Sequence, residues 1–281
     1  MDRDQFWVID GHGLIYRSIF RPGKPLTSPV TGEPTRGTHA FLKSLAAMVD
    51  RHRPAYLAMA VDAPRHSTFR SKLFEPYKAK RDEGEFPEEV GIQFTRIKQL
   101  TTLLGVPMVM VEGFEADDIM ASFAKVCAGP SCEVVIASAD KDLHQLVGPD
   151  VRVFDFGKEE WYDERMVEAK WGVPACKIVE VQTLMGDSTD GVPGVKGMGP
   201  KIATKLIQEH GSVEALVENT AALSESQAKN LACADLELCR KLVELRTDTP
   251  LAVSPSDLEW NGFDWASAEP LLRKLGFKSF L

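Results

Sequence analysis

Residues 107–142 read PMVMVEGFEADDIMASFAKVCAGPSCEVVIASADKD. Two apolar runs in this stretch, 107–111 and 133–137, have the length of buried strands, and a helical pattern within EADDIMASFAKVCA separates them. An acidic group follows each run. The carboxyl ends of parallel strands share one edge of a sheet, where ligands bind, so we expect both acidic groups to lie at that edge.

The same alternation extends over the first two-thirds of the chain. Further strands are predicted at 6–9, 55–61 and 151–154, and helices at 38–51 and 88–105. This order predicts an α/β fold with a mainly parallel sheet. After about residue 172 the pattern becomes helical, with glycines and prolines between segments. We therefore expect an α/β domain over 1–172 and a smaller helical domain over 173–281.

Nine carboxylates stand at the ends of apolar runs or in tight pairs. A single Asp there is often only a turn residue or a helix cap, and the helix dipole favours acids in a first turn. Five such groups at one edge would repel one another unless cations neutralised them, and Mg²⁺ prefers oxygen ligands. Two adjacent divalent ions could clamp the attacking and leaving oxygens of a phosphodiester. The predicted metal site comprises Asp10, Asp62, Glu115, Asp117, Asp118, Asp140, Asp142, Asp187 and Asp190.

The net charge of −8 does not decide whether the chain binds nucleic acid. Without the nine acids, 32 Asp plus Glu (41 − 9) stand against 33 Lys plus Arg, a remainder of +1. Bound metals would neutralise the acidic cluster, so the location of the basic residues matters more than the total.

Basic and aromatic residues alternate just after Asp62. Residues 65–81, RHSTFRSKLFEPYKAKR, hold six Lys or Arg against one acid, with two Phe and one Tyr between them. Cations for phosphates and aromatic faces for bases are what single-stranded nucleic acid requires. The alternative is a solvated basic loop whose aromatic side chains pack on the core.

A glycine-rich stretch, GVPGVKGMGPKIATKLI, spans residues 191–207. Its glycines allow close backbone approach, and Pro200 suits the first turn of a helix whose N–H groups would face a phosphate. Such a helix–hairpin–helix turn binds the duplex backbone without reading sequence. The alternative is a plain glycine loop between two helices.

The sequence gives little support for a membrane protein, a secreted protein or another kind of catalytic site. No apolar run has the roughly 18 residues of a membrane span, the N-terminus does not open a signal peptide, and the five cysteines form no CxxC pair. We therefore expect a cytoplasmic protein with reduced thiols. No Ser-His-Asp or Cys-His arrangement stands out, and the six histidines show no HExxH-type spacing.

Several motifs occur here in the order of one known family. They are VIDGHGLIYR (8–17), FRSKLFEPYKAKR (69–81), GFEADD (113–118), SADKDLHQLV (138–147), LMGDSTDGVPGVKGMGPKIA (184–203) and LRTDTPL (245–251). Over about residues 5–281 the chain resembles the 5′-nuclease domain at the N-terminus of bacterial DNA polymerase I, related to phage 5′-exonucleases and flap endonucleases. The resemblance implies a PIN-like domain with a helical arch at about 65–95 and a helix–hairpin–helix at about 191–207.

The resemblance also implies an activity and its residues. The family uses two Mg²⁺ or Mn²⁺ ions to hydrolyse DNA near single-strand/duplex junctions at 5′ ends, in primer removal and repair. All nine acids correspond to its metal site, Asp140 is expected to be catalytic, and Lys78 and Arg81 would contact the scissile phosphate. A K⁺ ion at the hairpin and a monomeric state are also expected. The implied DNA contacts are Arg17, Arg70, Tyr77, Lys78, Arg81, Gly194, Lys196, Gly197, Gly199 and Lys201.

One departure from the family pattern is visible. The usual GDxxDN reads GDSTDG here, with Gly191 in place of Asn, which removes a side chain that could support the metal site. A non-catalytic junction-binding protein of the same fold is therefore the alternative, and a PIN-like ribonuclease is a second. The sequence leaves open flap against exonuclease preference, an RNA or DNA 5′ strand, and a stand-alone protein against a polymerase fragment.

Overall fold

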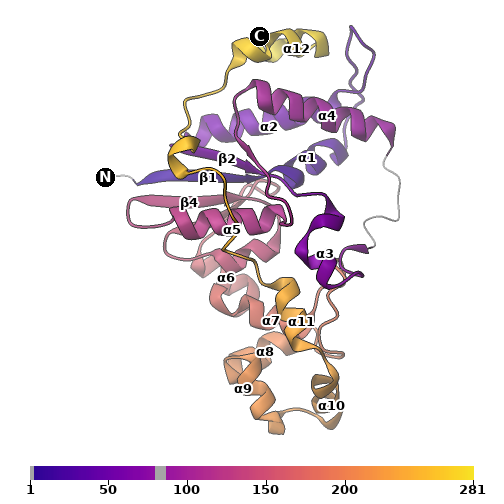
Figure 1. Ribbon diagram of the computed structural model, residues 1–281, viewed down its shortest axis with the longest axis vertical. Helices are drawn as coiled ribbons and strands as arrows, with labels where there is room; N and C mark the ends of the chain where they lie inside the picture. Colours follow the sequence, from indigo (N-terminus) through magenta and orange to yellow (C-terminus); the bar gives the residue numbers. More distant parts are fainter. Residues whose placement is uncertain (1–2, 80–86) are drawn as a thin grey trace.

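The computed structural model describes residues 3–79 and 87–281. A six-stranded sheet in the order β3-β2-β1-β4-β5-β6 forms its centre (Figure 1). Five strands pair in parallel, and β6 joins β5 antiparallel. The strands are β1 (Asp4–Asp10), β2 (Tyr56–Ala60), β3 (Met108–Val109), β4 (Cys132–Ala137), β5 (Val151–Asp155) and β6 (Glu160–Tyr162).

Apolar layers cover both faces of the sheet. The central strands are buried on both sides, which explains why their sequences read as continuous apolar runs. One face packs against α1 (Gly11–Phe20), α2 (Arg36–His52) and α4 (Glu88–Leu103), and the other against α5 (Ala116–Cys127) and α6 (Glu164–Trp171). The short helix α3 (Phe69–Leu73) follows β2.

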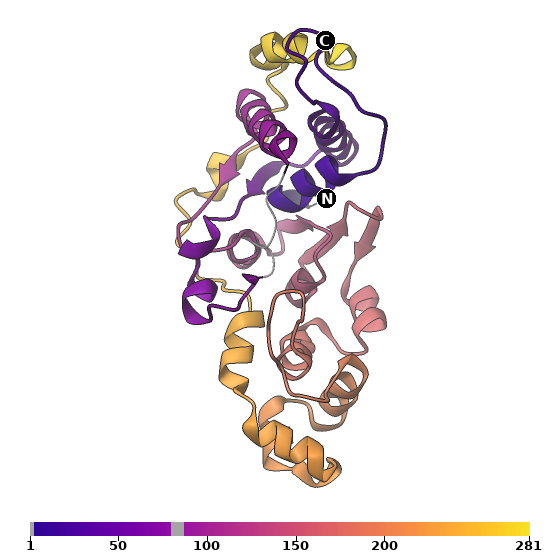
Figure 2. The ribbon, with the colours of Figure 1, turned by 90° about the vertical axis from the view of Figure 1, so that its right-hand side faces the viewer.

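A helical part extends from the α5–α6 side. Figure 2 shows the same elongated order as Figure 1, with this part at one end and α12 (Trp265–Leu275) at the other. Its helices are α7 (Ile178–Met185), α8 (Pro200–His210), α9 (Val213–Glu218), α10 (Glu225–Cys233) and α11 (Leu236–Val243). Short 3-10 turns lie at Arg65–Ser67, Lys141–Leu146, Ala175–Lys177, Thr220–Ala222, Pro255–Leu258 and Lys278–Phe280.

The predicted fold class is confirmed, with local differences. All five predicted strands form within two or three residues of their expected ends, and both predicted helices between them form. Strand β6 was not predicted, because three residues are too few to show a period of two. The sequence over 225–246, ESQAKNLACADLELCRKLVELR, reads as one helical segment, but the structure breaks it at Ala234, where α10 ends and Asp235 caps α11.

The C-terminal segment corrects the expected domain assignment. Residues 173–281 were expected to form the helical domain, but α12 packs on the α/β part. Ala268, Leu272 and Phe277 belong to the core layer that contains Trp7 and the buried face of α2. The backbone N–H of Trp260 donates to the carbonyl of Ala55 at 2.8 Å. The sequences of α8 and α12 have similar helical patterns of apolar residues. Such a pattern predicts a helix with one buried face, but it does not indicate which part of the protein that face packs against.

Among the described residues, no helix is both long enough and apolar enough to span a membrane.

Candidate active site

Four carboxylates from different elements meet at the carboxyl edge of the sheet. Asp10 ends β1, Asp62 follows β2, Asp117 lies in the first turn of α5, and Asp140 follows β4. The pKa of Asp10 is raised to about 6, first by burial and then by the charges of Asp62 and Asp140. Burial and then the charge of Asp140 raise the pKa of Asp117 well above its usual value, and Asp10 and Asp62 add to this. These four acids therefore act on one another, as the sequence predicts for this edge.

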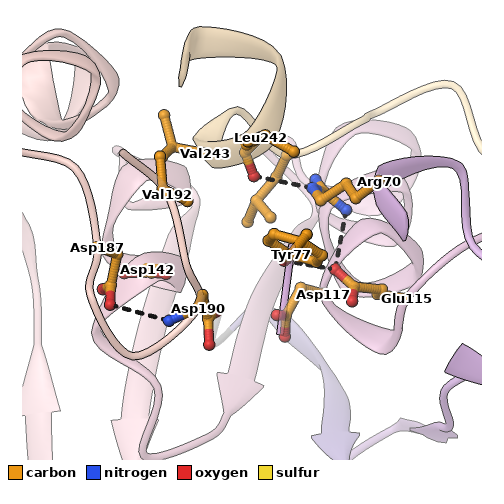
Figure 3. A pocket seen from close by; sticks show the side chains of 11 residues that line it. Arg70, Tyr77, Glu115, Asp117, Asp142, Asp187, Asp190, Val192, Leu242 and Val243 are labelled. Atoms are coloured by element: carbon orange, nitrogen blue, oxygen red, sulfur yellow. Dashed lines mark hydrogen bonds and ion pairs between the residues drawn. The ribbon is translucent and has the colours of Figure 1, made fainter. Parts of the chain in front are cut away.

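Three more carboxylates lie beside this group. Figure 3 shows Asp142, Asp187 and Asp190 around the same pocket as Asp117. Burial, followed by the charge of Asp140, raises the pKa of Asp142 to about 7, with smaller contributions from Asp187 and Asp190. Asp140 thus interacts electrostatically with acids on both sides.

Hydrogen bonds hold these carboxylates in place. Asp10 accepts from the N–H of Gly13 and from the hydroxyl of Ser138, both at 2.7 Å. Asp62 accepts from the N–H of Ala116 at 2.7 Å, which ties the end of β2 to the start of α5. Each of these bonds leaves carboxylate lone pairs for a further partner.

Asp142 and Asp187 are held by donors that were not among the predicted site residues. Gln182 on α7 donates to Asp142 at 2.7 Å, and Lys141 donates to Asp187 at 2.7 Å. Lys141 and Ser138 stand within the SADKD motif, so their position was a usable signal. Gln182 lies on a helix 40 residues from its partner, and nothing in the sequence marked it.

Glu115 is held by three donors from the segment that follows β2. Lys78 Nζ lies 2.9 Å from one carboxylate oxygen, while the hydroxyl of Tyr77 donates to the other at 3.0 Å. Arg70 Nη1 donates to that second oxygen at 3.1 Å. Burial would raise the pKa of Glu115, but the charges of Lys78 and Arg70 lower it below its usual value. Glu115 is therefore ionised and already paired with protein cations.

Two predicted site residues have structural roles. Asp118 is fully buried, and both its oxygens accept from Arg70, at 2.7 and 2.8 Å. In this structure Arg70 neutralises Asp118, and the expected role of Asp118 in metal binding stays a prediction. Arg70 is 1% exposed, so the prediction that it contacts DNA is wrong.

The arch residues divide into described and undescribed ones. Tyr77 is 4% exposed with its hydroxyl on Glu115, so the ring is not available to stack on a base, contrary to expectation. Lys78 lies beside the pocket acids, 3.8 Å from Asp190. Arg81, expected to contact the scissile phosphate, lies outside the described residues.

Arg17 lines a basic groove beside the sheet edge. The groove has a volume of about 720 Å³ and runs between α1, α2 and the turn that joins β5 to β6. Glu159 is the acid among its lining residues and is 3.5 Å from Arg51. The cations that line it are Arg17, Arg21, Lys24, Arg36, Lys43 and Arg51.

The glycine-rich hairpin joins α7 to α8 as predicted. Gly199 precedes the first turn of α8, and Pro200 is its first residue. Gly194 has φ +59°, and a Cβ there would lie 2.4 Å from the backbone nitrogen of Gly186, so the hairpin closes only with glycine. Lys196, Gly197 and Lys201 are exposed. The hairpin thus presents its cations and the N-terminus of α8 to solvent.

The acidic edge fits divalent cations without forming a complete ligand shell. Within residues 3–79 and 87–281, no three His, Cys, Asp or Glu side chains are already placed to hold a metal. In this structure Glu115 and Asp187 are paired with Lys78 and Lys141. Asp10, Asp117 and Asp142 are partly buried, have pKa values raised by burial and by neighbouring carboxylates, and offer oxygen donors, which is the chemistry that Mg²⁺ or Mn²⁺ requires.

Family models match nearly the whole chain. The model of the 5′-3′ exonuclease N-terminal resolvase-like domain matches residues 5–172, and that of the 5′-3′ exonuclease C-terminal SAM fold matches residues 173–266. The chain therefore belongs to the 5′-3′ exonuclease family and is a nuclease of that class.

Curated relatives agree with this assignment. A 5′-3′ exonuclease of Aquifex aeolicus is 35% identical and aligns over 98% of this chain and 93% of its own length. A DNA polymerase I of Rhizobium leguminosarum is 37% identical over 88% of this chain but only 25% of its own length. The chain thus spans about a quarter of that polymerase.

Solved structures show the same fold at low identity. The phage T5 5′-exonuclease with bound zinc ions aligns with a TM-score of 0.71 at 23% identity, covering 86% of this chain and 90% of its own. The catalytic core of Rad2 with a DNA substrate aligns with a TM-score of 0.61 at 16% identity, covering 98% of this chain and 88% of its own.

Proposed function

We propose that this protein is a divalent-metal-dependent 5′ nuclease that hydrolyses DNA phosphodiesters near single-strand/duplex junctions. The partly buried acids Asp10, Asp117 and Asp142 support this proposal most directly, because burial and neighbouring carboxylates, Asp140 among them, raise their pKa values and a cation would relieve this repulsion. A protein that only bound DNA would gain nothing from unneutralised carboxylates facing a phosphate.

The residues suggest two metal positions. Asp10, Asp62, Glu115 and Asp117 would hold one ion. A second group, Asp140, Asp142, Asp187 and Asp190, would hold the other, partly through water as Mg²⁺ prefers. Two ions held by these residues would supply Lewis-acid activation of water and stabilisation of the charge that develops on the phosphate. Crystals soaked in Mn²⁺ test this partition by anomalous scattering, and two peaks within one group would refute it.

Cationic surfaces on both sides of the acids suit two parts of a junction. We propose that the hairpin before α8 binds duplex backbone through Lys196 and Lys201, together with a K⁺ ion held by its backbone. The groove that contains Arg17 has the charge to hold a second arm. Lys78 would reach the scissile phosphate from beside the acids, where a fixed cation stabilises developing charge.

A substrate panel tests the proposed function. The purified chain is given a 5′-flap duplex, a recessed 5′ end, the unpaired single strand and an RNA-primed duplex, each labelled in turn at the 5′ and 3′ ends, with Mg²⁺ or EDTA. We expect Mg²⁺-dependent cuts close to the junction in the flapped strand. Selective binding without cuts in Mg²⁺ or Mn²⁺ would instead support the non-catalytic junction-binding protein.

A further inference from the structure

The ammonium group of Lys78 lies among the carboxylates at the acidic edge. Its ammonium group lies 2.9 Å from Glu115 and 3.8 Å from Asp190, and the residue is 9% exposed. Burial alone would lower the pKa of Lys78, but Glu115, Asp117 and Asp190 raise it well above its usual value. The side chain of Lys78 is therefore a buried cation paired with carboxylates.

The backbone at Lys78 is held in an unusual conformation. Its φ of +53° lies in the left-handed region, which is unfavourable for a non-glycine residue. A hydrogen bond of 2.8 Å from its N–H to the carbonyl of Asp190 stabilises this conformation. Lys78 lies at the base of the predicted arch, and we call residues 70–78 the arch base. The backbone hydrogen bond and the charge of Lys78 both hold the arch base to the GDSTDG turn (186–191).

Gly191 permits this fastening. A Cβ at Gly191 would lie 2.7 Å from the carbonyl oxygen of Pro76 and 3.7 Å from the nitrogen of Lys78. Real Cβ atoms do not approach backbone that closely, and Gly191 itself has φ +76°, which other residues rarely adopt. Any side chain at position 191 must push the turn and the 76–78 segment apart. The glycine in GDSTDG therefore fits the close contact rather than marking a damaged site.

We propose that Lys78 is a built-in counter-ion that neutralises Glu115 in the free protein and must leave it before Glu115 can bind a divalent ion. Gly191 makes this closed state possible. This proposal rests on the proposed metal-dependent function. It follows that metal loading and the delivery of Lys78 to a phosphate are one coupled event, because the same ammonium cannot hold Glu115 and contact DNA.

The reciprocity of coupled binding supplies the test. If Lys78 competes with metal, removing its charge must tighten metal binding, whereas a residue that contacts only phosphate would leave metal binding unchanged. Free Mn²⁺ is measured by electron paramagnetic resonance during titration of the DNA-free wild-type chain and three variants. These are Lys78→Met, Gly191→Ala, which keeps the lysine, and Lys72→Met, a control on the same basic segment away from the acids.

We expect Lys78→Met to bind its tightest Mn²⁺ about tenfold more strongly than wild type, a typical size for such coupling. Gly191→Ala should shift affinity in the same direction by less, and Lys72→Met should match wild type. Thermal unfolding in EDTA checks the fold, and Mn²⁺ should raise the Tm of Lys78→Met more than that of wild type.

Unchanged or weaker Mn²⁺ binding in folded Lys78→Met would overturn the proposal. If that variant does not fold, Gly191→Ala decides in the same way. Absence of Mn²⁺ binding in the wild type as well would contradict the proposed metal-dependent function itself, and the counter-ion role would fall with it.

Discussion

Arg70 uses all five of its N–H groups inside the protein. Besides its contacts with Glu115 and Asp118, its Nε donates to the carbonyl of Leu242 and its Nη2 to that of Glu244, both at 2.9 Å. It therefore joins the arch base, the start of α5 and the end of α11. A buried guanidinium with every donor satisfied has a structural role, and removing it leaves the buried carboxylate of Asp118 without its cationic partner.

Arg70→Met is expected to destabilise the protein by about 3–5 kcal/mol, the usual cost of breaking a buried ion pair. Urea unfolding followed by circular dichroism measures the change. Lys72→Met, two residues away and exposed, should stay within about 0.5 kcal/mol of wild type. A loss below about 1 kcal/mol in Arg70→Met would show that the network contributes little.

Lys78→Ala should slow DNA cleavage without weakening DNA binding. We expect single-turnover cleavage of a flap duplex to slow about 100-fold, because a cation at the phosphate is lost, while the Kd for the same DNA changes little. Fluorescence anisotropy in Ca²⁺ measures binding beside quenched-flow cleavage in Mg²⁺. Equal losses in rate and affinity would make Lys78 a binding residue only.

His52 predicts a pH dependence of stability. Its ring stacks on Trp7 at 4.5 Å, its Nε2 is buried without a hydrogen-bond partner among the described residues, and burial, then Arg51 and Arg152, lower its pKa. The unfolded chain therefore binds the proton more readily, so stability is lost as pH falls below about 6.5. The loss between pH 7.5 and 5.5 should be smaller in His52→Phe than in wild type. Equal losses would contradict this assignment.

Residue roles were only partly predictable from the chain. Asp117 and Asp118 are adjacent acids with the same sequence signal, but successive residues on a helix point in different directions. Asp117 faces the other carboxylates, whereas Asp118 turns to Arg70. That choice depends on where Arg70 lies after folding, which no local pattern contains. The placement of Gly191 against Pro76 is equally non-local.

Helices and strands were predicted best where burial imposes a period. The strands β1 and β4 are apolar throughout, and α2 and α4 end close to their expected limits. The break between α10 and α11 was missed because both segments are helical in composition and only the capping of Asp235 separates them. Element type follows from local sequence, while the partner of each element depends on the whole chain.

The hairpin before α8 should bind phosphates through charge. We expect a Lys196→Ala, Lys201→Ala double variant to weaken duplex binding whatever the sequence and to reduce the slope of log Kd against log salt by about 2, one per phosphate contact. Anisotropy titrations between 50 and 200 mM KCl are suitable. The control is the double variant Lys125→Ala, Lys278→Ala, two exposed lysines elsewhere. An equal change in slope for both double variants would exclude a specific role for the hairpin.

At the scale of the whole molecule, the acids lie where the sheet meets the helical part. Figure 1 places α5 and the sheet between α12 at one end and α7–α11 at the other. Asp142 and Gln182 join the two parts directly, and Arg70 joins the arch base to the end of α11. Duplex held by the helical part would therefore be fixed relative to the carboxylates, which makes cleavage near a junction the expected outcome.

The measurement that tests this account most directly is cleavage of a 5′-labelled flap duplex by wild type and Asp140→Asn, in Mg²⁺ and in EDTA. Asn keeps the oxygen that accepts from the N–H of Asp142 at 2.9 Å but removes the charge shared by both acid groups. We predict junction cleavage by wild type that EDTA abolishes, and a rate at least about 100-fold lower in the folded variant with DNA binding retained. Equal cleavage by both proteins, or cleavage that persists in EDTA, would contradict the account.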